Sequence, residues 1–276
     1  MARTPEDHRA AAMEARLVHC RHNLGSNHPN TLSLANNLAH ILRGQGRYEE
    51  ARIHDEDTLT RRRNVLGADH PSTLSSANNL VVDLAAVGAH VRARCLAEDT
   101  LARRRRVLGD SHPDTLSSAN NLARLLRALG ETAKACRLAE ETRARRRDLL
   151  GADHPSALSS ANNLVVDLAA VGAHLRARRL AEDTLSRRRH VLGDSHPDTL
   201  SSANNLAHVL RLQGEYERAR RVDEDTLRRR EEVLGEEHPD TVASANNLII
   251  DLLELGDNER AHELEERVGR SEPGDQ

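Results

Sequence analysis

Histidine followed by proline recurs along this chain at a constant spacing, and histidines in a regular register could form metal sites. The six histidines are 42 residues apart: His28, His70, His112, His154, His196 and His238. Zinc ligands lie about 2.0–2.3 Å from a shared ion, whereas equivalent residues of neighbouring helical units are separated by about 8–10 Å. No second column of His or Cys accompanies the first. We therefore expect no metal site, and we expect these histidines to hold their loops by hydrogen bonds to the backbone.

The pattern of polar side chains does not indicate catalysis either. The chain has no glycine-rich phosphate loop, and its Ser, His and acidic residues recur from unit to unit instead of forming one distinct set. An active site is normally a single constellation of residues, whereas nearly every polar feature here is periodic. We expect no enzymatic activity and no cofactor.

Runs of arginine could form a nucleic-acid-binding stripe. They cover residues 61–63, 103–106, 145–147, 187–189 and 228–230. Consecutive helical residues cannot all face one way, and an acid precedes an arginine by four residues in each run, which is the favourable orientation for an ion pair. These pairs are Asp57–Arg61, Asp99–Arg103, Glu141–Arg145, Asp183–Arg187 and Asp225–Arg229. With a net charge of −3 and no aromatic stacking platform, the runs indicate a solvated, locally neutralised outer face and no nucleic-acid partner.

Other residues repeat in the same register. Asn-Asn pairs begin at 36, 78, 120, 162, 204 and 246, and glycine falls at 46, 88, 130, 172, 214 and 256. Longer segments repeat after two units: LGDSHPDTLSSANNLA at 108–123 returns letter for letter at 192–207, and residues 66–90 return at 150–174 with only Thr73 changed to Ala157. The chain is therefore built from 42-residue units that alternate in two types.

Each unit predicts two helices. The residue after each His-Pro is a good N-cap, and the six are Asn30, Ser72, Asp114, Ser156, Asp198 and Asp240. In the second unit the apolar spacing predicts a first helix that ends at Gly88, a residue that readily adopts the left-handed conformation. A second helix is predicted from about residue 91 to 108, ended by Gly109. Its inward-facing positions are expected to be Ala93, Leu96, Leu101, Val107 and Leu108.

Composition and one column of small residues favour a stack of thin layers. The chain has no Phe or Trp and two tyrosines, so its core must be built from smaller side chains. One position of the second helix is alanine in every unit, which predicts close helix packing: Ala51, Ala93, Ala135, Ala177, Ala219 and Ala261. A helix pair cannot bury its apolar face alone, so neighbouring pairs must stack. We predict an all-α, right-handed superhelical α-solenoid of antiparallel helix pairs.

The pattern N-N-L-x-x-x-L-x-x-x-G-x-x-x-x-A with a 42-residue period resembles the tetratricopeptide repeat. The linker L-G-x-x-H-P-x-T is similar to the longer variant found in kinesin light chains and bacterial STAND-type signalling proteins. The resemblance implies one array over residues 1–276. Its expected parts are a leading half-repeat helix at 8–24, units starting near 25, 67, 109, 151, 193 and 235, a cap helix at 257–269 and a disordered tail at 270–276.

The resemblance also implies where a ligand would bind, because the first helix of each pair lines the concave groove in this family. Two asparagine columns then fall in the groove. They are Asn37, Asn79, Asn121, Asn163, Asn205 and Asn247, the inner column, and Asn36, Asn78, Asn120, Asn162, Asn204 and Asn246, the second column. An amide both donates and accepts, so such a ladder could grip the main chain of an extended peptide. Alternatively, one column ties adjacent repeats together.

The groove lining is expected to alternate between basic and apolar residues. Odd units carry His40, Arg124 or His208, followed three residues later by Arg43, Arg127 or Arg211, where even units carry aliphatic residues. Even units add an acid at the seam: Asp83, Asp167 and Asp251. Two interpretations follow. The arginines face an acidic ligand, or they pair with the seam acids, because a buried lone charge is costly.

The sequence therefore predicts a non-enzymatic scaffold that binds an extended, acidic peptide or protein segment. The alternative is a sensor or oligomerisation arm of a STAND-type system, acting by self-association, with end-to-end stacking as a route to homo-oligomers. Three cysteines without paired spacing point to a reducing compartment, and no apolar run is long enough to cross a bilayer. We expect a cytoplasmic protein without a membrane partner.

Overall fold

The computed structural model describes residues 5–271, and the side chains of residues 8–269. The backbone forms two compact units, Met1–Leu138 and Ala139–Gln276. The first unit contains α1 (Pro5–Leu24), α2 (Pro29–Gly44), α3 (Tyr48–Leu66), α4 (Pro71–Ala86), α5 (His90–Leu108) and α6 (Pro113–Ala128). The division between the units falls inside α7 (Thr132–Leu150).

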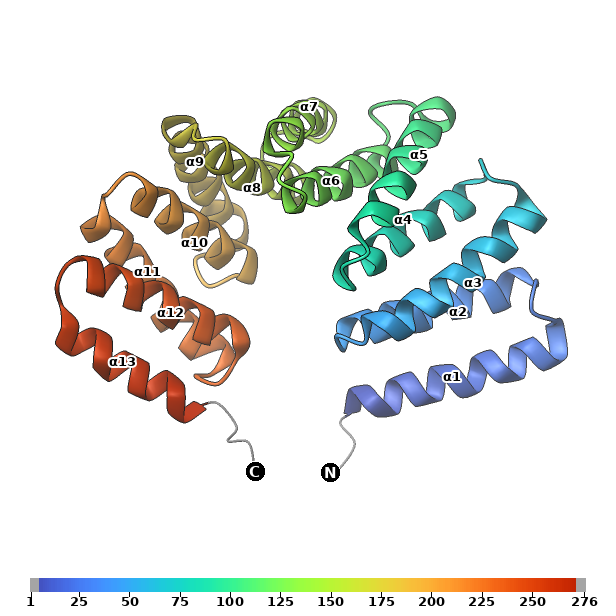
Figure 1. Cartoon of the computed structure of the whole chain (residues 1–276), viewed down its shortest axis with the longest axis horizontal. Helices are drawn as coiled ribbons and strands as arrows, with labels where there is room; N and C mark the ends of the chain where they lie inside the picture. Colours follow the sequence, from blue (N-terminus) through green and yellow to red (C-terminus); the bar gives the residue numbers. More distant parts are fainter. Residues whose placement is uncertain (1–4, 272–276) are drawn as a thin grey trace. The chain divides into compact units, whose positions relative to one another are not determined.

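The second unit continues with the same alternation of helix lengths. It contains α8 (Pro155–Ala170), α9 (His174–Leu192), α10 (Pro197–Leu212), α11 (Tyr216–Leu234), α12 (Pro239–Glu254) and α13 (Asn258–Ser271). Residues 5–271 thus form thirteen helices, which pack as consecutive antiparallel pairs (Figure 1). This confirms the predicted all-α repeat solenoid. No helix in the described part of the chain is long and apolar enough to cross a membrane.

Every first helix begins at a histidine cap. In α6, His112 has extended backbone angles, Pro113 occupies the first helical position, and His112 Nδ1 accepts a hydrogen bond from the backbone N–H of Asp114 at 3.1 Å. The same cap opens α2, α4, α8, α10 and α12. The predicted backbone role of the histidines is therefore confirmed. The prediction that Asn30, Ser72, Asp114, Ser156, Asp198 and Asp240 are the N-caps is wrong, because the imidazole takes the position of the capping side chain and these residues donate to it.

The helix ends follow the glycine pattern. After α4, Gly88 has a φ of +78°, and after α5, Gly109 has a φ of +87°, a conformation that glycine adopts without the cost a Cβ would add. The helix α5 itself, His90–Leu108, matches the predicted span to within one residue.

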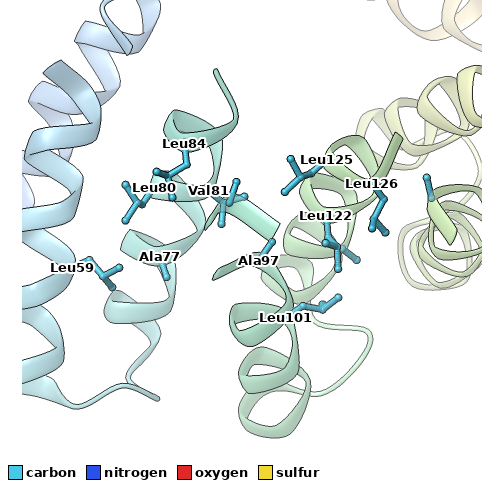
Figure 2. Packing of buried hydrophobic residues seen from close by; sticks show 13 residues of the cluster. Leu59, Ala77, Leu80, Val81, Leu84, Ala97, Leu101, Leu122, Leu125 and Leu126 are labelled. Atoms are coloured by element: carbon cyan, nitrogen blue, oxygen red, sulfur yellow. The ribbon is translucent and has the colours of Figure 1, made fainter. Parts of the chain in front are cut away.

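The core of each unit is a thin layer of aliphatic side chains between stacked helices. In the first unit one cluster joins α3 to α6, with Leu59, Leu80, Leu84, Leu101 and Leu126 among its members (Figure 2). The alanine column of the second helices is at most 1% exposed at all six positions, which confirms the predicted close packing. The prediction for Val107 is wrong: this side chain is 44% exposed.

Helices lie at both expected ends of the array, but the last one continues to Ser271, past the residue 269 at which the cap helix was expected to end. The leading helix expected at 8–24 is α1, and the cap helix expected at 257–269 is α13. Of the predicted tail, residues 272–276 lie outside the described backbone. The interpretation of residues 1–276 as one array stays a prediction.

Candidate functional site

The first helices present a stripe of polar residues that is not buried, and we call this stripe the amide face. In α6 it includes Ser117, Asn121 and Arg124, which follow one another at helical spacing and are half-buried or exposed, and the exposed Ala128 continues the same stripe. The amide face of the first unit comes from α2, α4 and α6, and that of the second unit from α8, α10 and α12. All six inner-column asparagines lie on it: Asn37 is exposed and the other five are half-buried.

The inner column contains two kinds of asparagine. Asn121 donates through Nδ2 to Asn78 Oδ1 at 3.1 Å, and Asn205 donates to the backbone oxygen of Asn162 at 3.5 Å. Within residues 8–269 the other four amides make no hydrogen bond: Asn37, Asn79, Asn163 and Asn247. These four retain both a donor and an acceptor for a ligand.

The second column contributes to packing between repeats. Asn78 Oδ1 also accepts from Ser118 Oγ at 3.0 Å, and Asn162 Oδ1 accepts from Ser202 Oγ at 3.0 Å. One orientation of the Asn36 amide satisfies both of its polar atoms: the nitrogen donates to Asp55 Oδ1 at 3.1 Å, and the oxygen accepts from Arg62 Nη1 at 3.2 Å. Asn120 and Asn204 are half-buried, whereas Asn246 is exposed.

Two of the predicted site arginines are held by carboxylates. Arg43 Nη1 donates to Asp55 Oδ2 of α3 at 2.7 Å and to both oxygens of Asp83 of α4 at 3.1 Å. Arg211 Nη1 makes the same contacts in the second unit, to Asp223 at 2.5 Å and to Asp251 at 3.2 Å. The acids are fully buried, and the arginine side chains are only 12% and 10% exposed. The sequence left open whether these arginines face an acidic ligand or pair with the seam acids. In the structure both pair with the seam acids, Asp83 and Asp251.

Each of these clusters contains one arginine and two buried carboxyls that share it. Burial raises the pKa of Asp55 and of Asp223 to about 7; the paired arginine opposes this shift and the second carboxyl adds to it. Burial also raises the pKa of Asp83 and Asp251. One proton shared within each cluster would therefore be retained near neutral pH. The middle copy of the cluster differs in sequence, because Ala139 takes the place of Asp55 and Asp223.

The remaining predicted site arginines lie on α6. Arg124 is exposed and Arg127 is half-buried. Both line a pocket between α4 and α6 of about 420 Å³, together with Tyr48, Val82, Asn121 and other residues. Three of the predicted site residues, Asn121, Arg124 and Arg127, therefore line the same pocket, and all three lie on α6.

Sequence comparison identifies the repeats. Models of the tetratricopeptide repeat match residues 30–106, 115–156, 157–198 and 199–240, so the matched segments cover most of the chain and three of them have the 42-residue length. The chain belongs to the tetratricopeptide repeat family. No curated protein matches the sequence.

Solved structures of tetratricopeptide repeat proteins are similar to this chain. A candidate kinesin light chain of Podosopora anserina with nearly identical TPR-like repeats is 28% identical, with a TM-score of 0.65, over 75% of this chain and 98% of that one. BtubC (BKLC) from P. vanneervenii is 18% identical, with a TM-score of 0.68, over 83% and 95%. NprR of B. thuringiensis in complex with its cognate peptide NprX is 14% identical, with a TM-score of 0.62, over 93% and 72%. The last two likenesses show the fold alone.

A column of buried arginines in this tetratricopeptide array was not predicted from the sequence. In α5, Arg104 is 3% exposed; its Nη1 donates to the backbone oxygen of Asp114 at 2.7 Å and to Ser118 Oγ at 2.8 Å, both on α6. Its Nη2 donates to Ser75 Oγ of α4 at 3.3 Å. The other buried members of this column are Arg62, Arg146, Arg188 and Arg230.

The arginine runs therefore do not form a purely solvated face, because one residue of each run turns inward to connect successive helix pairs. Its neighbours behave as predicted. All five acid–arginine pairs expected four residues apart are formed, with Arg103 Nε donating to Asp99 Oδ1 at 2.8 Å as one example. A detectable signal existed for the buried column: each arginine precedes its serine partner by 14 residues, as in Arg104 and Ser118.

Proposed function

We propose that this protein is a non-enzymatic scaffold whose amide face binds an extended peptide segment of a partner protein. The observation that carries the proposal is the free inner-column amides, which repeat at the same helical position. Because each amide can donate and accept, they are suited to the N–H and C=O groups of a peptide main chain and require no particular side chain. Peptide capture by a tetratricopeptide fold has a precedent in the NprR–NprX complex.

A preference for acidic peptides is a narrower part of this proposal. Arg43 and Arg211 are neutralised by their buried carboxyls, so they contribute little free charge to the amide face. Arg124 is exposed and has no partner among the described residues. It is the arginine that would attract an acid from the ligand, and the expected bias is small because an exposed ion pair contributes about 0–1 kcal/mol.

Replacing Asn79 or Asn163 with alanine is expected to weaken binding about fivefold per residue, since one hydrogen bond contributes about 1 kcal/mol. Binders would first be selected on an array of extended peptides of varied charge and then measured by isothermal titration calorimetry. The control is Asn23→Ala, which removes an exposed amide from α1 and not from the amide face. Equal affinity for wild type and both face variants would refute the proposal.

Self-association is the second candidate, and one feature favours it. Ile250 and Leu253 of α12 are each 48% exposed, at the positions where α4 has Val82 and Ala85 beside α6. Exposed apolar side chains of this kind can pack against another copy of the chain. Light scattering over a concentration series should then show growing particles, which Ile250→Gln with Leu253→Gln abolishes. A constant monomer mass for wild type would exclude this function.

A further inference from the structure

The identity between two of the repeats ends at residue 124, which lines the pocket between α4 and α6. The match between 108–123 and 192–207 is complete, yet the next positions differ: Arg124 becomes His208, and Ala128 becomes Leu212. Both residues of the first copy line the pocket. The two copies therefore differ in the charge and size of side chains at positions that line this pocket, as they do at many positions farther along the unit.

Apolar side chains, three of them alanine, make up much of the pocket lining. Its apolar lining comes from the ends of α4 and α6: Val81, Val82, Ala85, Ala86, Leu125 and Ala128. The volume of about 420 Å³ lies within the range of about 300–1,000 Å³ typical of ligand pockets. It can accept an aliphatic side chain from a peptide that lies on the amide face, because Asn121 belongs to both the face and the pocket wall.

The rim of the pocket carries polar groups that are not used elsewhere. Arg124 is exposed and unpaired within the described chain. His90 Nδ1 is buried and lacks a hydrogen-bond partner there, and Tyr48 lies beside the same opening. A positive charge next to an apolar pocket favours a ligand that combines an aliphatic side chain with a carboxylate.

We infer that this pocket, referred to below as the α4–α6 pocket, selects the ligand of the amide face. It holds one aliphatic side chain of the bound peptide, and Arg124 at its rim pairs with the acidic side chain of the adjacent residue. The inference rests on the proposed peptide-binding function and adds a sequence preference to it. The amides bind the peptide main chain whatever its sequence, and the α4–α6 pocket provides the preference for particular peptide side chains.

The two contacts are expected to contribute unequally. Burying a Leu-sized side chain contributes about 1.5–3 kcal/mol, which corresponds to a change in affinity of roughly 10- to 150-fold. An exposed ion pair contributes about 0–1 kcal/mol, or up to about fivefold. The aliphatic residue should therefore dominate affinity, and the acidic residue should refine it.

The chain itself supplies variants that should fold. Leucine occurs at the position of Ala128 in the second copy, as Leu212, and histidine occurs at the position of Arg124, as His208. Leu212 is 42% exposed in its own helix, so a leucine at this position does not need a cavity in the core. Ala128→Leu fills the α4–α6 pocket and Arg124→His removes most of its charge at pH 8, with circular dichroism confirming that each variant melts like wild type.

The probes are fluorescein-labelled Ser-Gly host peptides that carry Leu-Glu, Ala-Glu or Leu-Gln at the centre, measured by fluorescence anisotropy at pH 8. Wild type should bind the Leu-Glu peptide at least tenfold more tightly than the Ala-Glu peptide. Ala128→Leu should abolish that difference. Arg124→His should leave it in place and remove the smaller preference for Leu-Glu over Leu-Gln.

Equal affinity of wild type for the Leu-Glu and Ala-Glu peptides, or absence of binding to both, overturns the inference. So does a preference that survives in Ala128→Leu. Asn79→Ala, which lies outside the pocket lining, separates the two proposals. If it weakens peptide binding while Ala128→Leu changes nothing, the amide face binds peptides and the α4–α6 pocket does not select them. If neither variant changes binding, both proposals fail.

Discussion

Replacing Arg104 with alanine will lower the free energy of unfolding by about 2–3 kcal/mol. The guanidinium donates to a backbone oxygen and a serine on α6 and to a serine on α4, and hydrogen bonds from charged groups contribute about 1.5–3 kcal/mol. Loss of the buried stem also leaves a cavity. Urea unfolding followed by circular dichroism measures the change.

Its neighbour in the sequence is the matched control. Arg103 is partly exposed and pairs with Asp99 and Asp69, so Arg103→Ala should cost no more than about 1 kcal/mol. A second substitution, Arg104→Met, keeps much of the stem volume and removes the hydrogen bonds. A methionine variant as stable as wild type would show that packing, and not hydrogen bonding, is what Arg104 provides.

The stability of the protein will fall as the pH rises from 5.5 to 8, because of the two arginine–carboxyl clusters. The pKa of Asp55 and Asp223 is about 7 in the folded chain and about 3.9 in an unfolded one. The folded state therefore holds protons that the unfolded state has released. The resulting stability is fully present below pH 3.9 and is lost as the pH rises through 7. Each cluster should contribute a change of about 1–2 kcal/mol over this window.

Asparagine variants isolate this effect from the titration of other residues. Asn has the shape of a protonated aspartic acid, so Asp55→Asn with Asp223→Asn should flatten the curve of unfolding free energy against pH. The other charged groups that face the clusters remain: Arg43, Arg62 and Asp83 in the first, and Arg211, Arg230 and Asp251 in the second. Chemical denaturation at pH 5.5, 6.5, 7.5 and 8 gives the comparison. Parallel curves for wild type and variant would show that the two carboxyls do not hold shared protons.

The helix pairs could be predicted from the sequence because local signals define them. Pro113 at a first helical position and Gly109 at a helix end act through the backbone alone, and their repetition made the period unambiguous. The caps were misassigned for a related reason: Asp114 belongs to a residue type that usually caps helices, whereas His112 does not. Side-chain type predicted a capping role but not which of the two polar residues on either side of Pro113 performs it.

Long-range polar contacts were harder to predict. Arg104 and Arg103 look alike in a run of arginines, and only the position of the next helix pair makes one buried and the other exposed. Arg43 had two admissible roles, and the sequence could not separate them because the second acid that binds it, Asp55, lies on a different helix from the seam acid Asp83. The pocket beside Arg124 also depended on the packing of α4 against α6, which no local pattern specifies.

The arginine–serine contacts do not by themselves determine which helices pair with each other when the chain folds. Arg104 with Ser118 and Arg188 with Ser202 are interchangeable connections, so α5 would fit α10 about as well as it fits α6. Only the first junction differs, since Cys20 and Leu34 occupy the arginine and serine positions there. Correct pairing must therefore come from the short tether between successive helices, which gives the adjacent partner a high effective concentration. When the protein refolds at high concentration, helices of other chains compete for the same contacts, and domain-swapped oligomers should form.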